Sequence, residues 1–252
     1  MDLNADVGEG VGQDPKLIPL ITSANVACGS HAGDPETMRA TVVLARDHGV
    51  AVGAHPSYPD RQGFGRRPMA LSEAEVEACV SIQVRALAEI ATLEGVTLRH
   101  VKPHGALYNV AAQDAAVADA IARAVGRLNR SLVLVGLAGS ELIAAGQRAG
   151  LATAHEAFAD RGYRADGTLM PREEPGSVIH EADAVVPRAI AMVLDGMVTA
   201  VDGRRVPLHV DTLCLHGDTE GAAALAARLR QGLIDAGIVL APLMVRSSHT
   251  SG

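Results

Sequence analysis

The stretch RDHGVAVGAH (Arg46–His55) decides the fold, because a helix end, an apolar run and a polar residue follow one another in it. Gly49 comes after a helical pattern and before the apolar run Val50–Ala54, as a glycine just past a helix C-terminus does. The same joint recurs at Gly95, Gly150 and Gly237. Helices that lead into the next strand are what connect parallel strands, so the repeated joint predicts a parallel α/β domain.

Short apolar runs alternate with amphipathic segments along the chain. Strands are predicted at Asp2–Asp6, Ser23–Ala27, Val50–Ala54, Leu98–Lys102, Leu132–Leu137, Leu151–Phe158 and Leu213–His216. Helices are predicted at Pro35–His48, Glu73–Glu94, Ala115–Leu128, Ser140–Ala149 and Glu220–Ala236. Asp34 before Pro35 is a typical N-cap, and Ser72 with Glu75 forms a capping box. Seven strand–helix units indicate a barrel of fewer than eight strands, although an open doubly wound sheet fits the same pattern.

Other segments interrupt this alternation. Asp202-Gly203 lies between two alternating runs, which predicts a hairpin. The loops 55–72 and 159–177 follow strands and are rich in Pro, Gly and Arg. Loops of this length in a compact domain are usually functional lids. Since no shift in composition marks a domain boundary, we expect one domain at 1–245 and a disordered tail at 246–252.

Composition excludes several classes of partner. The net charge is −7 and only 2% of residues are aromatic, which argues against a nucleic-acid surface. No apolar run approaches the roughly 18 residues of a membrane span. Three cysteines (Cys28, Cys79 and Cys214) without a C-x-x-C pair favour neither a disulfide framework nor a cysteine zinc site. We therefore expect a cytoplasmic protein with neither a nucleic-acid nor a membrane partner.

Polar side chains gather where the predicted strands end. Ligands bind at the carboxyl ends of strands in barrels and open parallel sheets alike, so these side chains are expected to share one pocket. A histidine beside Gly or Pro recurs there in GSHAGD, GAHPSYPD, KPHGALYN and LHGDTEG. The residues at these ends are Asn4, Asp6, Glu9, Asn25, Cys28, His31, Asp34, His55, Lys102, His104, Glu156, Asp160, Arg161, His216 and Asp218.

Six motifs between Asp2 and about Leu240 together resemble the LamB/YcsF family: DLNADVGEGVG, ANVACGSHAGDP, GAHPSYPDRQGFGRR, VKPHGALYN, FADRGY and CLHGDTEGA. Ser30 stands where the family motif has an aromatic, a difference expected to widen the pocket wall. The resemblance implies a seven-stranded β/α barrel of the glycoside hydrolase/deacetylase type. It also implies the role of the A subunit of an ATP-dependent 5-oxoprolinase, which hydrolyses the 5-oxo-L-proline lactam to L-glutamate together with two partner subunits.

Opening a lactam with ATP needs cations for phosphate, a general base for water and an acid for the leaving nitrogen. Lys102 is the candidate cation, His104 the acid, base or polarising group, and Asp6 the general base or a metal ligand. Glu156 and Asp160 offer further catalytic carboxylates. Substrate binding is assigned to Arg161, whose guanidinium suits a carboxylate, and to the remaining polar strand ends. These are Asn4, Glu9, His31, His55 and His216.

Several alternatives stay open. Asp6, His31 and His55 are also a candidate metal set, although the same histidines suit phosphate or carboxylate. Arg66 and Arg67 are candidates for gripping ATP phosphates, and Cys28 is either a nucleophile or a small buried hydrophobe. The chain has no complete nucleotide-binding motif, which fits a subunit that shares ATP, with its Mg²⁺, with partners. An independent metal-dependent deacetylase or amidase, and a non-catalytic binding subunit, are the competing functions.

Overall fold

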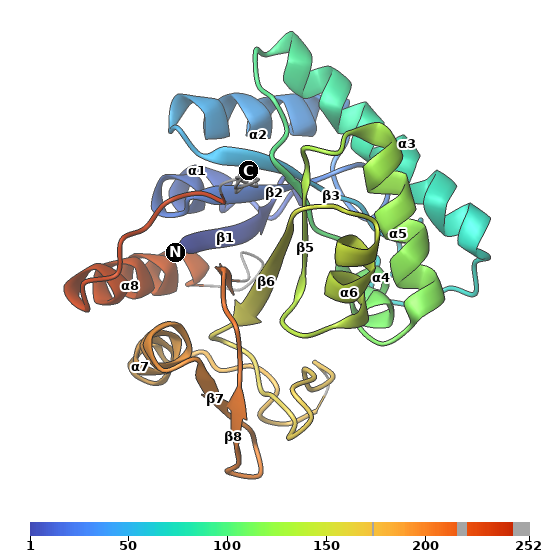
Figure 1. Cartoon of the computed structure of the whole chain (residues 1–252). Coiled ribbons are helices and arrows are strands. Elements are labelled where there is room, and N and C mark those ends of the chain that lie inside the picture. The colour runs from blue at the N-terminus through green and yellow to red at the C-terminus, as the bar shows by residue number, and fades with distance from the viewer. Residues whose placement is uncertain (173, 216–220, 244–252) are drawn as a thin grey trace, which may run out of the picture.

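The structure, a computed structural model, describes residues 1–172, 174–215 and 221–243. Its centre is a closed barrel of seven parallel strands in the order β1-β2-β3-β4-β5-β6-β9 (Figure 1). The strands are β1 (Asp2–Val7), β2 (Ser23–Ala27), β3 (Ala51–His55), β4 (His100–Val101), β5 (Val133–Leu137), β6 (Thr153–Phe158) and β9 (Thr212–Leu215). The predicted seven-stranded barrel is confirmed, and the open sheet is excluded because β9 pairs with both β6 and β1, the two ends of the remaining strand order.

Helices cover the outside of the barrel, as the crossover pattern predicts. They are α1 (Asp14–Leu17), the 3₁₀ turn η1 (Ile18–Leu20), α2 (Pro35–Asp47), α3 (Glu73–Leu93), α4 (Gly105–Ala111), α5 (Ala115–Leu128), α6 (Glu141–Arg148), α7 (Ala182–Leu194) and α8 (Ala222–Asp235). The predicted caps are present: Asp34 accepts a hydrogen bond from the amide of Thr37, and Ser72 and Glu75 form a capping box. The four joint glycines all have positive φ, as helix C′ residues do.

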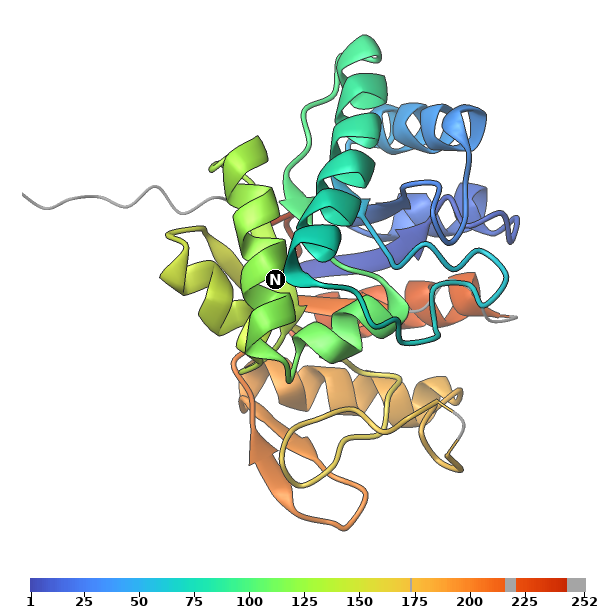
Figure 2. The same ribbon diagram turned by 90° about the vertical axis from the view of Figure 1, so that its right-hand side faces the viewer.

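A small lobe lies between β6 and β9 in the sequence and projects to one side of the barrel (Figures 1 and 2). It holds α7 and the antiparallel hairpin of β7 (Met197–Thr199) and β8 (Arg205–Pro207), which confirms the hairpin predicted around Asp202-Gly203. The helix α7 is not among the helices predicted above. Pro187 lies inside it and argues, in sequence alone, against a continuous helix.

The inside of the barrel is polar, and alternation along the strands explains why. In β1, Asp2, Asn4 and Asp6 hydrogen-bond to side chains of other barrel strands, whereas Leu3 and Ala5 are buried in the apolar layer under the helices. Ser23 and Asn25 of β2, His100 of β4, Lys102, Glu156 of β6 and Thr212 of β9 are buried with them. The apolar core therefore lies between strands and helices, and the centre is a hydrogen-bonded network.

Some predictions concern residues outside the described ranges. His216, Asp218 and the tail at 246–252 are among them. Among the described helices, none has the length and apolar character that crossing a membrane requires.

Candidate active site at the carboxyl end of the barrel

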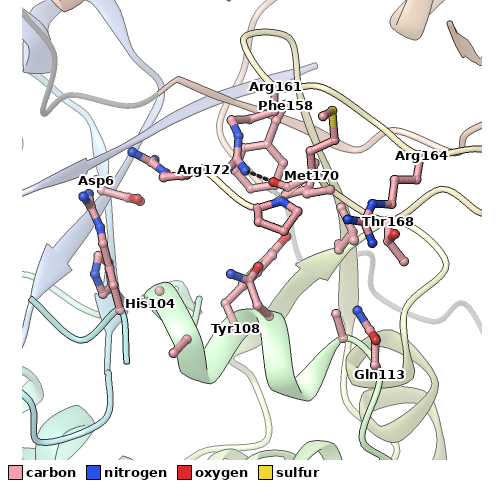
Figure 3. A pocket seen from close by; sticks show the side chains of 18 of the residues that line it. Asp6, His104, Tyr108, Gln113, Phe158, Arg161, Arg164, Thr168, Met170 and Arg172 are labelled. Atoms are coloured by element: carbon pink, nitrogen blue, oxygen red, sulfur yellow. Dashed lines mark hydrogen bonds between the residues drawn. The ribbon is translucent and has the colours of Figure 1, made fainter. Parts of the chain in front are cut away.

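A cavity of about 300 Å³ opens at the carboxyl ends of the strands. Asp6 and His104 lie at one end of it, and Arg164 and Thr168 lie at the other (Figure 3). The loop 159–177 therefore borders the cavity, as expected for a lid. The polar residues that line it are Asp6, Glu9, Arg66, His104, Tyr108, Asn109, Gln113, Arg161, Arg164, Thr168 and Arg172.

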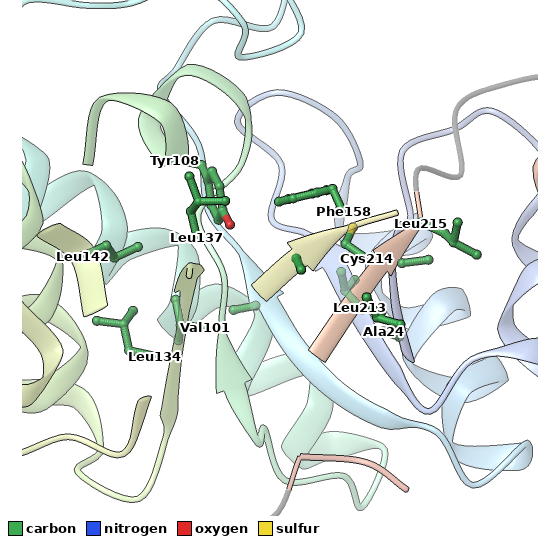
Figure 4. Close-up of a cluster of buried hydrophobic side chains, with 14 of the residues drawn as sticks. Ala24, Val101, Tyr108, Leu134, Leu137, Leu142, Phe158, Leu213, Cys214 and Leu215 are labelled. Atoms are coloured by element: carbon green, nitrogen blue, oxygen red, sulfur yellow. The ribbon is translucent and has the colours of Figure 1, made fainter. Parts of the chain in front are cut away.

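Part of the cavity wall is apolar. Leu137, Phe158 and Tyr108 contribute to it, and they continue into the core around Cys214 (Figure 4). The rings of Tyr108 and Phe158 meet edge to face with centroids 5.9 Å apart. Burial, together with the nearby Glu156 carboxylate, holds the pKa of Tyr108 well above its usual value, so its hydroxyl stays protonated.

Lys102 follows β4 and points into the barrel below the cavity. Its Nζ lies 3.0 Å from Oδ1 of Asp6 and 2.9 Å from Oε1 of Glu156. It also contacts Oδ1 of Asn4 at 3.3 Å and Sγ of Cys214 at 3.1 Å. Burial alone would lower the pKa of Lys102, but the surrounding anionic groups outweigh it and raise that pKa well above the usual value. Lys102 is therefore a fixed positive charge beneath the cavity.

Three histidines from different strand ends pack beside Lys102. The rings of His31 and His104 are stacked, with centroids 3.8 Å apart. His104 Nδ1 lies 2.9 Å from His55 Nε2, and His31 Nε2 lies 3.1 Å from Oε1 of Glu9. Burial, followed by the neighbouring His55, lowers the pKa of His104, and burial also lowers the pKa of His31. Both rings are therefore neutral at pH 7.

Two carboxylates and two imidazoles come close enough to share one cation. One ligand atom from each of them lies within 4.8 Å of every other. We call this group the acceptor cluster; its members are Asp6, Glu9, His55 and His104. It contains two of the three predicted metal residues. His31, the third, is not a member because its Nε2 contacts Glu9 instead.

The loop 55–72 brings backbone groups to the site. The carbonyl oxygen of Phe64 accepts a hydrogen bond from His104 Nε2 at 2.9 Å. Among the residues that the structure describes, Phe64 is the non-glycine residue whose φ is positive, at 54°. Such strain is characteristic of functional sites. Arg67 forms an ion pair with Asp60. The hydrogen bond from Arg67 is the largest of the effects that lower the pKa of the Asp60 carboxyl to about 2. Arg66 lines the cavity and Arg67 does not, so only Arg66 is placed to meet a phosphate.

The second lid, 159–177, is held by Arg161. Its Nε donates to the carbonyl of Ser177 at 3.1 Å and its Nη2 to the carbonyl of Met170 at 2.5 Å. Asp160 is buried at the base of this lid, where its carbonyl accepts from the amide of Ile179 at 2.8 Å. Arg161 lines the cavity, whereas Asp160 does not.

The structure thus separates the predicted site residues into layers. Asp6, Glu9, His104 and Arg161 line the cavity. Asn4, His31, His55, Lys102 and Glu156 lie beneath it, connected to the lining residues by hydrogen bonds and ion pairs. Of the seven catalytic and metal candidates expected to share one pocket, Asp6 and His104 line the cavity. His31, His55, Lys102 and Glu156 are joined to the lining residues below the opening, and Asp160 lies at the base of the second lid.

Other predictions also change. Burial raises the pKa of the Cys28 thiol to about 12, which disfavours the thiolate that a nucleophile needs. Ser30 does not line the cavity, so its departure from the motif does not widen that wall. Sequence reasoning missed Tyr108, Arg164 and Arg172 as lining residues, although the first lies in VKPHGALYN and the others in the predicted second lid.

Comparison with known proteins agrees with this architecture. A protein of Chloroflexus aggregans, named as the A subunit of 5-oxoprolinase, is 56% identical over 245 residues, which cover 95% of this chain and 97% of that protein. The crystal structure of a "lactam utilization protein" from Thermus thermophilus superposes with a TM-score of 0.91 at 46% identity, covering 96% of this chain and 99% of that one. A structure titled "T48 deacetylase with substrate" shares the fold alone, with a TM-score of 0.52 at 15% identity over 96% of this chain and 86% of that one.

The sequence profile described as the LamB/YcsF family matches residues 1–248. With the seven-stranded barrel and the polar residues at its carboxyl end, this match assigns the protein: the chain belongs to the LamB/YcsF family.

Proposed function

We propose that this chain is the A subunit of an ATP-dependent 5-oxoprolinase and carries the site that opens the lactam of 5-oxo-L-proline. The proposal rests on the cavity, which is lined by Asp6, Glu9 and His104 at one end and by an arginine-bearing lid at the other. Relatives and a solved structure whose names refer to 5-oxoprolinase and lactam utilization support it.

The cavity suits a small anionic amide. Its volume of about 300 Å³ lies at the lower end of the range for small-molecule sites. Guanidinium groups of Arg66, Arg161, Arg164 and Arg172 border it and are suited to a carboxylate or phosphate. The apolar wall of Leu137 and Phe158 fits the methylene side of a five-membered ring.

ATP is a co-substrate in this proposal. Transfer of a phosphoryl group from ATP to the lactam oxygen releases ADP and makes the ring carbon electrophilic. Water then adds to that carbon, the ring C–N bond breaks as the nitrogen takes a proton, and γ-glutamyl phosphate forms. A second water hydrolyses this acyl phosphate to L-glutamate and phosphate.

The residues at the opening have roles that follow from their positions. Asp6 and Glu9 reach the cavity as carboxylates and are the proposed bases for water. His104 lines the cavity and burial lowers its pKa, so the neutral ring is the proposed relay for the proton that reaches the leaving nitrogen when no metal ion occupies its Nδ1. Lys102 and Glu156 act from below by fixing Asp6, rather than by touching substrate. Two partner subunits are proposed to supply the nucleotide-binding parts that this chain lacks.

The competing function is a metal-dependent deacetylase or amidase that acts without ATP, which the acceptor cluster favours. Glutamate release from 5-oxoproline separates the two. The assay uses this chain alone, the two partner subunits alone, and the complete complex, each with and without ATP.

We expect glutamate only from the complete complex with ATP. ATP-independent hydrolysis of amides or acetylated sugars by the isolated chain would instead establish the competing function. Glutamate release by the partners without this chain would show that its role is binding rather than catalysis.

A further inference from the structure

In the acceptor cluster, His55 and His104 each direct one ring nitrogen at a backbone carbonyl oxygen. His55 Nδ1 lies 2.7 Å from the carbonyl oxygen of Lys102, and His104 Nε2 lies 2.9 Å from the carbonyl oxygen of Phe64. A carbonyl oxygen only accepts hydrogen bonds, so each of these ring nitrogens carries the hydrogen. In a neutral imidazole the other nitrogen is then an acceptor.

Those two remaining nitrogens face each other. His55 Nε2 and His104 Nδ1 are 2.9 Å apart, within hydrogen-bond distance, and the ring hydrogens assigned above both point at carbonyl oxygens, so the pair is satisfied only by a proton or a metal ion placed between the two nitrogens. Oδ2 of Asp6 lies 3.3 Å from His55 Nε2, and Oε1 of Glu9 lies 3.5 Å from His104 Nδ1. Two lone pairs and two carboxylate oxygens therefore converge, which is unfavourable unless a cation lies between them.

The neighbouring side chains hold these four ligand atoms in place. Oδ1 of Asp6 accepts from Lys102 Nζ at 3.0 Å and from Asn25 Nδ2 at 2.9 Å, and Oδ2 of the same carboxylate lies toward His55. His31 Nε2 lies 3.1 Å from Oε1 of Glu9. Metal-binding histidines characteristically donate their other ring N–H to a carbonyl or carboxylate, as both cluster histidines do here.

The spacing also fits a metal ion. Bonds of about 2.0–2.2 Å to nitrogen and oxygen place adjacent ligand atoms of a tetrahedral or octahedral site about 3.0–3.5 Å apart. The three contacts of the cluster are 2.9, 3.3 and 3.5 Å. Imidazole and carboxylate together suit Zn²⁺ and the neighbouring divalent transition metals. The balance of charge also favours a cation. Lys102 alone faces Asp6 and Glu156, and Glu9 adds a third carboxylate to the same site.

We propose that the acceptor cluster binds one divalent transition-metal ion, through the two carboxylates, His55 Nε2 and His104 Nδ1. Three of its four residues reach the cavity or border it, so the ion would lie where a substrate carbonyl could be polarised. The inference goes beyond the proposed function and does not rest on it. With the ion bound, Asp6, Glu9 and His104 would act as its ligands rather than as free bases and a proton relay, and the ion would activate the water or polarise the amide carbonyl.

The test is a metal titration of the full-length chain after dialysis against a chelator. Zn²⁺ is titrated by calorimetry, and Co²⁺ is titrated by visible absorption, which reports ligand type and geometry. We expect one equivalent to bind, with a Co²⁺ spectrum of mixed nitrogen and oxygen ligands and a rise in the thermal midpoint. His55→Ala and His104→Ala should each weaken binding by roughly a hundredfold or more, since even outer-contact changes cost about 10–100-fold.

Matched variants separate this site from others. His155 and His209 form a ring pair near Asp211, so the double variant His155→Gln/His209→Gln removes an adventitious surface site and should leave the one equivalent intact. His31→Gln retains all four ligands and changes only an outer contact of Glu9, so it should weaken Zn²⁺ binding by about 10–100-fold, less than either ligand variant. Circular dichroism of each variant establishes folding. Absence of a stoichiometric equivalent in the wild type overturns the proposal in favour of a proton shared by the two histidines, and so does unchanged binding in a folded His55→Ala or His104→Ala chain.

Discussion

The ammonium nitrogen of Lys102 lies 2.9 Å from Oε1 of Glu156, and both side chains are buried inside the barrel. Asp6 holds the same ammonium at 3.0 Å, so one lysine balances two carboxylates of different strands. The ammonium that the sequence assigns to phosphate binding is therefore engaged by groups of the chain itself. In the proposed reaction its part is to hold Asp6, which lines the cavity, from below.

Replacing Lys102 should accordingly destabilise the fold as well as reduce activity. Lys102→Met leaves Glu156 and Asp6 as buried charges without their shared counter-ion, and breaking a buried pair in this way costs about 3–5 kcal/mol. Urea unfolding measures the change in the free energy of unfolding. Glu156→Gln in the Lys102→Met background removes one of the stranded charges and should recover part of the loss. Additive losses in the double variant would contradict the pairing.

Gly53 of β3 leaves room for the buried ring of His100. A Cβ atom at position 53 would lie 2.2 Å from His100 Nε2, and that nitrogen is fixed by donating to Asn25 Oδ1 at 2.7 Å. Gly53→Ala should therefore destabilise the protein by about 1–3 kcal/mol through overpacking. Gly126→Ala in α5 is the matched control, because its nearest contact is an ordinary 3.8 Å and alanine favours a helix. Equal unfolding curves for the Gly53 variant and wild type would show that the ring moves aside.

His100 also predicts how stability depends on pH. Burial, followed by the charges of Lys102 and His55, lowers the pKa of His100 from 6.5 to about 3. Between these values the unfolded chain takes up a proton that the folded chain does not, so stability falls as the pH decreases from about 6.5 toward 3. At pH 5 this single group should remove about 2 kcal/mol of the stability present at neutral pH.

The measurement is the free energy of unfolding at pH 7 and pH 5 for wild type and His100→Gln, whose amide nitrogen can replace the donor to Asn25. His31 and His104, whose pKa values are also lowered, contribute equally to both proteins. We expect the difference between the two pH values to be smaller in the variant by about 2 kcal/mol. The same pH dependence in both proteins would mean that His100 titrates normally in the fold.

Much of the barrel could be predicted because its signals are local. A glycine after a helix, followed by an apolar run, is visible in one short window, and Gly49 between α2 and β3 is an example. The helix α7 could not be predicted in this way, since packing in the lobe overrides the preference of Pro187.

The site was predictable only as a set of strand ends. Parallel strands bring Asp6, His55 and Lys102 to one end of the barrel whatever their separation in sequence, and that rule needs no coordinates. Which side chain contacts which depends on barrel geometry: Lys102 meets Glu156 of a distant strand, and Phe64 meets His104 through both its carbonyl oxygen and its ring. The alternation of polar and apolar residues in DLNADV is a signal that did not enter the predictions from sequence, and the hydrogen bonds of Asp2, Asn4 and Asp6 show that these three face inward.

Asp6 and Asp2 allow a test of catalysis within one strand. Both are carboxylates of β1, but Asp6 reaches the cavity, whereas Asp2 lies at the other end of the strand and accepts hydrogen bonds from Thr22, Ser23 and Thr212. Asp6→Asn keeps an oxygen for Lys102 but removes the proposed base, so kcat for glutamate release by the complete complex should fall by about 10²–10⁴-fold. Its thermal midpoint should change little, since Glu156 still pairs with Lys102.

Asp2→Asn should instead reduce the stability of the protein and leave kcat nearly unchanged. The amide cannot accept all of these hydroxyl hydrogen bonds, so the protein should lose about 1–3 kcal/mol of stability, while kcat of the folded complex stays close to wild type. Measuring kcat and the thermal midpoint of both variants in the reconstituted complex therefore yields two separate effects if Asp6 does chemistry. Similar losses of activity and stability in both would mean that β1 contributes only structure, and near-normal turnover with Asp6→Asn would show that Asp6 is not the base and would leave Glu9 as the candidate in this chain.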